Sequence, residues 1–291
     1  MKCFFLAVLS LAVSSVHSFG QISVTTIGSS AFTLDFSSYT GGGLHTDPTA
    51  VDSMGYLDSD DWLTYGVAGV DSFTTAGQTK NGGRYGRGEH NGETSQIGLT
   101  SFDVSNGGTL NRTLGVKPNT NSGKDERTFN PGVLELRMVN NTGSTITGLN
   151  FIFDVYEFNQ RNSEYQLDFK VGISYAVESA DGYAGPATPT SASHVTEDGR
   201  DAGGDVTLID WVKTTKSGSV LGLGWTVGSE LFLRWEGSVV DDLDTNMDLV
   251  ALDNISITAI PEPSTYALIF GGFAIGVVVF VKRRRAVKDS A

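Results

Sequence analysis

The chain of 291 residues contains a single cysteine and no convincing amphipathic helix. Cys3 lies in an N-terminal apolar segment that we expect to be removed, so the mature protein has no cysteine. Disulfides, cysteine-based zinc sites and a cysteine nucleophile are therefore excluded. A mature domain of roughly 240 residues is long enough to bury a sufficient core without such links.

The sequence also lacks the short motifs that identify common enzyme classes. The mature chain keeps His45, His90 and His194, and none of them has the spacing of a His-Glu-x-x-His zinc site. Neither a Gly-x-Ser-x-Gly nucleophile motif nor a P-loop is present in the sequence. We therefore expect a non-enzymatic protein, and the alternative is a secreted glycan-active enzyme on a jelly-roll scaffold.

Positive charge is scarce, with 20 basic against 33 acidic residues. The two terminal segments described below carry six of these basic residues and one acidic residue, so their removal leaves a net charge of −18. Such a charge argues against nucleic acid and anionic lipid as partners. A negative net charge is compatible with cations and neutral polysaccharide as binding partners. Alternatively, the charge only keeps the protein soluble outside the cell.

Residues 1–20 have the order of a secretory signal peptide. Lys2 supplies the positive start, and residues 3–13 form an apolar run that is too short for a membrane span. Small residues before positions 19 and 21 suit cleavage by signal peptidase, so we expect the mature chain to begin at Phe19 or Gln21.

The C-terminal part of the chain combines a short motif, an apolar run and a basic cluster in that order. The motif is Pro261-Glu262-Pro263, and residues 266–281 form an apolar run without a charge. As a helix this run spans about 24 Å, somewhat less than the roughly 30 Å hydrocarbon core of a bilayer. A snorkelling Lys282 extends it, so we predict one transmembrane helix over 266–281.

Four consecutive basic residues follow the apolar run: Lys282, Arg283, Arg284 and Arg285. By the positive-inside rule they act as a stop-transfer signal and remain in the cytoplasm with residues 286–291. Residues before the motif then lie outside the cytoplasm. Pro261 and Pro263 favour an extended backbone, which displays Glu262 at the membrane surface.

Over residues 260–285 the chain resembles the PEP-CTERM sorting signal of Gram-negative, exopolysaccharide-producing bacteria. The resemblance implies recognition by an exosortase, a membrane cysteine transpeptidase, with cleavage near the motif and transfer to a surface component. We therefore expect an inner-membrane precursor with one span and its β domain outside the cytoplasm. The product would be a protein of the cell surface or extracellular matrix, associated with exopolysaccharide.

Residues 21–259 are predicted to form one all-β domain, a β-sandwich or jelly roll. Apolar residues alternate with polar ones over 149–155 and 165–175, and the polar loop 158–163 between them has the size of a hairpin connection. Residues 39–130 are glycine-rich and predict short strands, long loops and turns. The four tryptophans are expected in the core. Further strands are predicted at 133–139, 206–212, 231–235 and 251–257.

Several of these segments resemble a β-sandwich module of secreted bacterial proteins, which sometimes occurs beside nuclease or lamin-tail domains. This resemblance supports the predicted fold. The segments are 133–137, 140–143, 157–161, 231–235 and 251–256.

Two groups of residues are candidates for binding. The first is an acidic loop in which residues with side-chain oxygen atoms stand at alternate positions. These oxygens could bind Ca²⁺, or the segment is a solvated acidic loop between two strands. Met247 stands where an EF-hand loop needs glycine, which excludes that motif. A glycine-rich loop could contact a glycan through Arg84, Tyr85 and Arg87, or be a flexible loop without a ligand. The candidate metal ligands are Asp242, Asp244, Asn246, Asp248 and Asp253.

Overall fold

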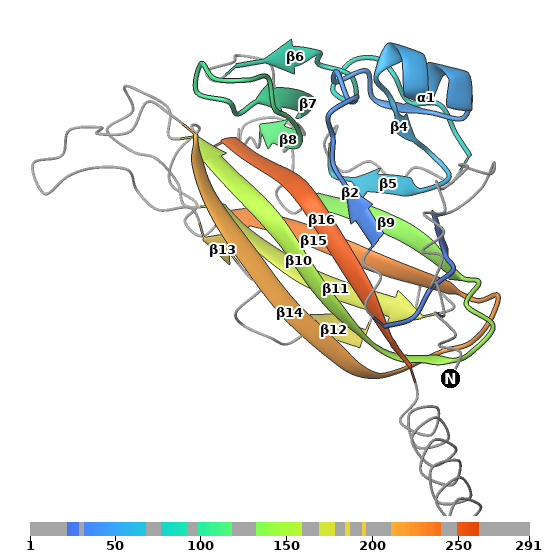
Figure 1. Cartoon of the computed structure of the whole chain (residues 1–291). Coiled ribbons are helices and arrows are strands. Elements are labelled where there is room, and N and C mark those ends of the chain that lie inside the picture. The colour runs from blue at the N-terminus through green and yellow to red at the C-terminus, as the bar shows by residue number, and fades with distance from the viewer. Residues whose placement is uncertain are drawn as a thin grey trace, which may run out of the picture.

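The computed structural model of the chain describes most of the predicted β domain (Figure 1). The signal segment, residues 262–291 and the acidic loop 240–248 lie outside the described residues. Within the described part, no helix is long and apolar enough to cross a membrane. The described residues are 22–28, 32–67, 77–91, 98–117, 132–158, 169–177, 184–186, 194–195, 211–239 and 249–261.

Two seven-stranded sheets form the body of the domain, as the alternating apolar pattern predicted. In sheet A the strand order is β1-β9-β15-β11-β12, with β5 also paired to β9 and β13 to β11. Its strands are β1 (Ile22–Val24), β5 (Trp62–Tyr65), β9 (Gly132–Asn140), β11 (Phe169–Val177), β12 (Ala184–Pro186), β13 (His194–Val195) and β15 (Glu230–Val239).

In sheet B the strand order is β14-β10-β16-β8-β7-β6, with β2 also paired to β16. Three long strands, β14, β10 and β16, form the front layer in Figure 1, and the strands of sheet A lie behind them. The strands of sheet B are β2 (Phe32–Leu34), β6 (Glu89–His90), β7 (Gly98–Asp103), β8 (Arg112–Lys117), β10 (Ile146–Phe158), β14 (Val212–Trp225) and β16 (Leu249–Pro261).

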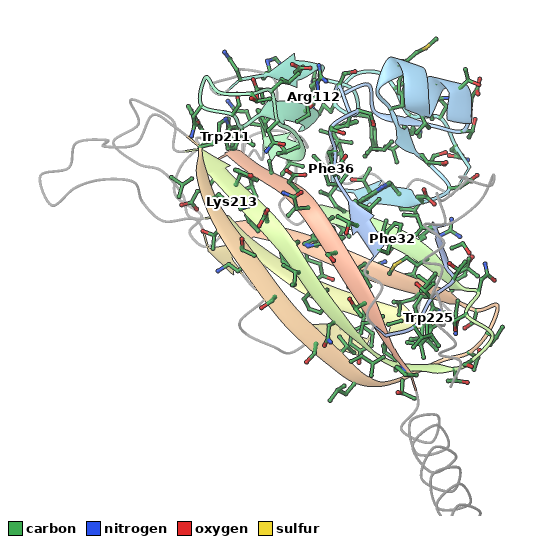
Figure 2. The ribbon with its side chains drawn as sticks, in the orientation of Figure 1. Phe32, Phe36, Arg112, Trp211, Lys213 and Trp225 are labelled. Carbon is green, nitrogen blue, oxygen red and sulfur yellow. The ribbon has the colours of Figure 1, made fainter. Side chains whose placement is uncertain are left out.

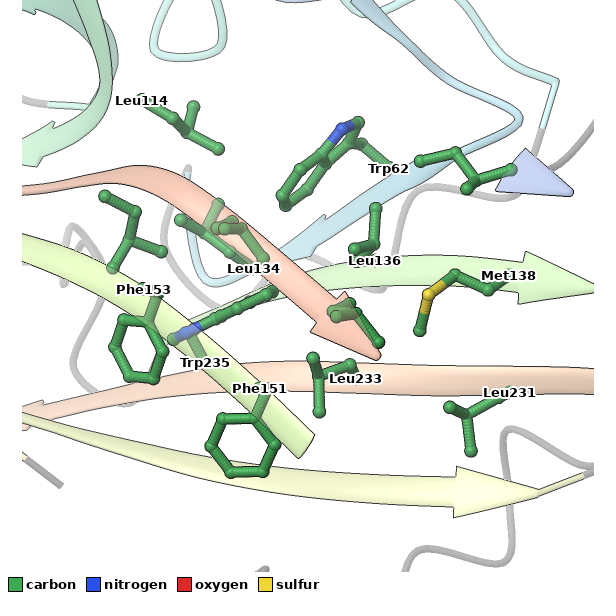
Figure 3. Close-up of a cluster of buried hydrophobic side chains, with 14 of the residues drawn as sticks. Trp62, Leu114, Leu134, Leu136, Met138, Phe151, Phe153, Leu231, Leu233 and Trp235 are labelled. Carbon is green, nitrogen blue, oxygen red and sulfur yellow. The ribbon is translucent and has the colours of Figure 1, made fainter. Parts of the chain in front are cut away.

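The core lies between the two sheets, because every second residue of β9, β10, β15 and β16 is apolar and points inward. Figure 3 shows Leu134, Leu136 and Met138 of β9 beside Leu231, Leu233 and Trp235 of β15. Burial of a large apolar side chain contributes about 1.5–3 kcal/mol to folding, so this cluster is the main source of stability.

Aromatic side chains connect the two sheets through this core. Trp62 and Trp235 of sheet A stack with ring centroids 6.1 Å apart, and Phe153 of sheet B meets Trp235 edge-on at 5.8 Å. All four tryptophans are buried, with at most 5% of each exposed, which confirms that they belong to the interior.

The predicted hairpin between the strands around positions 152 and 170 is wrong. β10 pairs with β14 and β16 in sheet B, whereas β11 pairs with β15 in sheet A. The two strands thus belong to different sheets instead of pairing edge to edge, and Tyr175 and Val177 of β11 pack against the core that lies between the sheets. The connection through residues 159–168 is long enough to cross between the sheets.

The glycine-rich region adds short elements at one end of the sandwich (Figure 1). It includes a helix that the sequence analysis missed, α1 (Pro48–Met54), and a small parallel sheet of β3 (Leu44–His45) and β4 (Leu57–Asp58). The helix has Asp47 as its N-cap, Pro48 in its first turn and the left-handed Gly55 after its end. At the C-terminal end of the domain, β16 includes Pro261, so the first residue of the Pro-Glu-Pro motif is part of the last strand.

Candidate functional site

The outer face of sheet B presents a regular array of small polar side chains. Phe151 and Phe153 of β10 point into the core, so the alternate residues Asn150 and Ile152 point outward. The neighbouring strands have the same alternation, and the register places their outward residues in rows across the three strands. We call the set Asn150, Ile152, Thr215, Ser217, Ser219, Ser256 and Thr258 the hydroxyl face.

The rows of the hydroxyl face follow from the strand register. Asn150 lies between Ser219 and Thr258, and Ile152 lies between Ser217 and Ser256. Ile152 is 49% exposed, so an apolar side chain stands in the middle of a polar surface. Neighbouring strands are about 4.8 Å apart. The side chains within one row are therefore spaced at a distance similar to the width of a sugar ring.

Next to the hydroxyl face is a hydrogen-bonded cluster centred on Asp154 of β10. Lys213 Nζ lies 2.6 Å from Asp154 Oδ2, and the Thr215 hydroxyl donates to Asp154 Oδ1 at 2.6 Å. Asn254 Nδ2 donates to Asp154 Oδ2 at 2.9 Å. Figure 2 shows Lys213 on β14 beside β10. Burial alone would raise the pKa of Asp154, but these three hydrogen bonds outweigh it and hold the pKa below its usual value.

The carboxylate of Asp253 lies beside this cluster on β16. Burial raises the pKa of Asp253, and the nearby charge of Asp154 adds to the rise. The hydrogen bonds to Asp253 come from Asn254, from Asn111 and from the backbone of Phe36. Asn254 adopts a left-handed conformation with a φ of 49° at a register shift between β10 and β16, which marks a β-bulge.

Beyond the Asp154 cluster, an apolar cluster closes the end of the outer face. Trp211 packs against Phe102 and Phe158 with ring centroids 4.8 and 5.2 Å away. The Asn106 side chain holds the backbone of Trp211 through two hydrogen bonds of 2.8 and 3.0 Å. Trp211 is buried, so it cannot serve as an open stacking platform for a sugar.

The structure does not test the candidate metal ligands as a group, because only Asp253 is among the described residues. Asp242, Asp244, Asn246 and Asp248 lie outside the described residues. The carboxylate of Asp253 is already engaged with Asn254 and Asn111. Among the residues described, no group of three or more His, Cys, Asp or Glu could hold a metal ion. Ca²⁺ binding by the acidic loop stays a prediction that calorimetric titration can test.

The glycine-rich loop with the candidate glycan contacts docks against the segment around Gly41. Leu99 on β7 holds it through hydrogen bonds to the Arg84 carbonyl at 2.8 Å and from the Arg87 N–H at 3.2 Å. Tyr85 packs against the core cluster, and Lys80 Nζ lies 6.0 Å from the centre of its ring. Both arginines are half-buried, and a glycan contact through Arg84, Tyr85 and Arg87 stays a prediction.

No protein-family model matches the chain, and no curated protein matches its sequence. Among solved structures, a cleaved adhesin domain of Lys-gingipain from Porphyromonas gingivalis has 12% identity, covers 79% of this chain and 98% of that chain, and gives a TM-score of 0.35. A xylan-binding domain from Paenibacillus barcinonensis has 12% identity, coverage of 58% and 89%, and a TM-score of 0.29. The Caldicellulosiruptor saccharolyticus CBM27-1, solved with mannohexaose, has 15% identity, coverage of 58% and 88%, and a TM-score of 0.28. At TM-scores this low, the likenesses carry no argument about function.

Proposed function

We propose that the chain is an exported, non-enzymatic protein of the bacterial cell surface or extracellular matrix. Signal peptidase removes residues 1–20, and the helix 266–281 holds a single-span precursor in the inner membrane with the β domain outside the cytoplasm. An exosortase-type transpeptidase then cleaves near Pro261-Glu262-Pro263. The order of the motif, the apolar run and the basic cluster at residues 282–285 supports this route.

We further propose that the β domain binds extracellular polysaccharide through the hydroxyl face. The observation that carries this proposal is the array of hydroxyl and amide groups around Ile152, which are exposed on β10 and β14 and half-buried on β16. Such groups both donate and accept hydrogen bonds, as sugar hydroxyls do. The net charge of −18 for the mature chain favours a neutral or cation-bridged polysaccharide over an anionic one.

Affinity for exopolysaccharide from the native host tests the proposal. Ile152→Arg places a bulky cation in the centre of the hydroxyl face and is expected to weaken binding at least about tenfold, a loss of 1.4 kcal/mol. Val227→Arg is the matched control, because Val227 is 52% exposed in the turn between β14 and β15. Equal binding by both variants and the wild type would contradict the assignment of this face.

The alternative is a glycan-active enzyme, and one observation favours it. Asp154 and Asp253 lie on neighbouring strands, and their pKa values are shifted in opposite directions, as those of a general acid and base are. Both carboxylates are buried and hydrogen-bonded within the protein, however, which favours a structural role. New reducing ends in the polysaccharide that depend on Asp154 and Asp253 would establish the enzyme instead.

A further inference from the structure

The segments that form the end of the sandwich where β16 terminates contain no charged residue. In the strand register Ile146 of β10 lies between Trp225 and Pro261. The start of the domain joins them, because β1 pairs with the end of β9 and the Gly28 N–H donates to the Ala259 carbonyl at 3.0 Å. A mature chain with a net charge of −18 therefore has one part without charge. We call the segments 22–28, 140–153, 217–229 and 254–261 the uncharged end.

An exposed apolar patch lies on the uncharged end. Leu221 of β14 is 72% exposed, more than any other large apolar side chain among the described residues. Gly148 of β10 lies between Leu221 and Ile260 in the register. A Cβ atom on Gly148 would lie 3.0 Å from Leu221 Cδ2 and 3.3 Å from Ile260 Cδ1, so these two side chains lean together over the glycine. We call Leu221 and Ile260 the Leu221 patch, and exposed apolar groups of this kind favour contact with an apolar partner.

The patch lies close to the point where the C-terminal tail leaves the domain. Pro261 is the last residue of β16, and the predicted membrane helix begins at Tyr266. The five steps of chain from Pro261 to Tyr266 span at most about 18 Å when fully extended. Leu221 lies two strands away from Ile260, a distance of about 10 Å. A membrane helix at 266–281 would therefore keep the patch within reach of the lipid headgroups.

We propose that the Leu221 patch docks into the headgroup region of the bilayer as long as the tail is attached. This inference rests on the proposed single-span precursor. Anionic headgroups repel the acidic parts of the domain but not the uncharged end, so this end is the one that can approach the membrane. The tether makes docking an intramolecular event, and a small apolar contact is then sufficient.

The Leu221 patch directly adjoins the hydroxyl face. The next row across the same three strands consists of Ser219, Asn150 and Thr258. Docking therefore places this end of the hydroxyl face against the headgroups, and removal of the tail frees it for polysaccharide.

Fluorescence quenching in vesicles tests the contact. The exported chain with an intact tail, made in a host without an exosortase, has no cysteine once the signal segment is removed, so Ser219→Cys carries a single fluorophore beside the patch. The vesicles contain phosphatidylcholine and phosphatidylglycerol with a nitroxide at the headgroup. We expect quenching at position 219 and none at Met54→Cys, because Met54 belongs to α1 at the opposite end of the domain (Figure 1). A label at Phe270→Cys reports whether the tail is inserted.

Substitutions at Leu221 give the decisive comparison. Leu221→Asp should lower the quenching at position 219 at least about twofold, because a carboxylate is costly to place among lipids. Leu221→Trp should keep or raise the quenching, because tryptophan favours the membrane interface. Met54→Asp is the matched control, since Met54 is 64% exposed, and it should change nothing.

The other outcomes overturn the docking and separate it from the proposed route. Equal quenching in the wild type and Leu221→Asp, or a loss of quenching in Leu221→Trp, would show that Leu221 does not contact lipid. Quenching at position 270 without quenching at 219 would remove the docking alone and leave the single-span precursor, whereas no quenching at 270 would overturn both. A dimer of the released protein that Leu221→Asp dissociates would assign the patch to a second copy of the chain.

Discussion

Asn254 Nδ2 donates a hydrogen bond to Asp154 Oδ2 at 2.9 Å and joins a bulged residue of β16 to the neighbouring strand β10. The same carboxylate accepts from Lys213 and Thr215 on β14. One side chain therefore holds together the three strands that carry the hydroxyl face. The geometry of that face depends on this contact.

Replacement of Asp154 by alanine should lower the free energy of unfolding by about 1–3 kcal/mol, because three donors lose their acceptor. The pKa of Asp154 in the folded protein lies below its usual value of about 3.9 in an unfolded chain. The ionised carboxylate therefore stabilises the fold above pH ~3.9, and this stabilisation is lost as the pH falls through the pKa of the folded state. The wild type should thus lose more stability than Asp154→Ala on acidification. Urea unfolding between pH 2 and 6 measures this difference. Asp35→Ala, which removes an exposed carboxylate bonded to Ser37, is the control.

Asp253→Asn should have the opposite pH dependence. The pKa of Asp253 is raised, so its neutral form stabilises the fold below pH ~3.9 and this contribution is lost as the pH rises through the folded pKa. Asparagine stays neutral and can still accept a hydrogen bond from the backbone of Asn254. The variant should therefore be at least as stable as the wild type at pH 7, with a flatter profile in urea unfolding from pH 4 to 8. The prediction is wrong if the difference in stability between Asp253→Asn and the wild type is less favourable to the variant at pH 7 than at pH 4.

The long strands of the domain could be predicted from the sequence, whereas β14 could not. β9, β10, β15 and β16 alternate apolar with polar residues, because one face of each packs in the core. β14 is an edge strand, and the register places Thr214 and Lys216 on the same side as Val155 and Phe153. An inward-facing lysine protects an edge against pairing with other chains, and it also removes the apolar pattern that identifies a strand.

The hydroxyl face could not be predicted from the sequence for a related reason. A serine or threonine stands at every second position over 215–219 and 256–258, which is the only local sign of the hydroxyl face in the sequence. Its rows exist only because β10 lies between β14 and β16, and that order depends on contacts far apart in the sequence. The helix α1 was also missed, although Asp47, Pro48 and Gly55 mark its ends, because seven residues are too few to establish a helical period.

The docking of the glycine-rich loop can be tested at two glycines that both have a positive φ. A Cβ atom on Gly41, where φ is 75°, would lie 2.0 Å from the Gly88 carbonyl oxygen, so Gly41→Ala must displace the loop. On Gly107, where φ is 83°, a Cβ atom would meet nothing within 4 Å. Gly107→Ala should lower the free energy of unfolding by about 1 kcal/mol, because alanine disfavours the left-handed backbone conformation. Gly41→Ala should lower it clearly more, because its Cβ atom also collides with the loop. Thermal unfolding compares them, and equal melting temperatures would show that the contact with Gly88 contributes nothing.

Processing at the C-terminus is expected to depend on Glu262, the first residue beyond the last strand. Pro261 is buried at the end of β16, and the Thr147 hydroxyl donates to its carbonyl at 3.1 Å, so the sandwich holds the start of the motif in place. Glu262→Gln removes the one charge between the two prolines and should leave most of the protein uncleaved in the membrane fraction of its native host. Ser264→Ala keeps the motif and is the control. Intact-mass measurement of the protein distinguishes a terminus near Pro263 from one at Ala291, and normal cleavage of Glu262→Gln would show that the carboxylate is not part of the recognition.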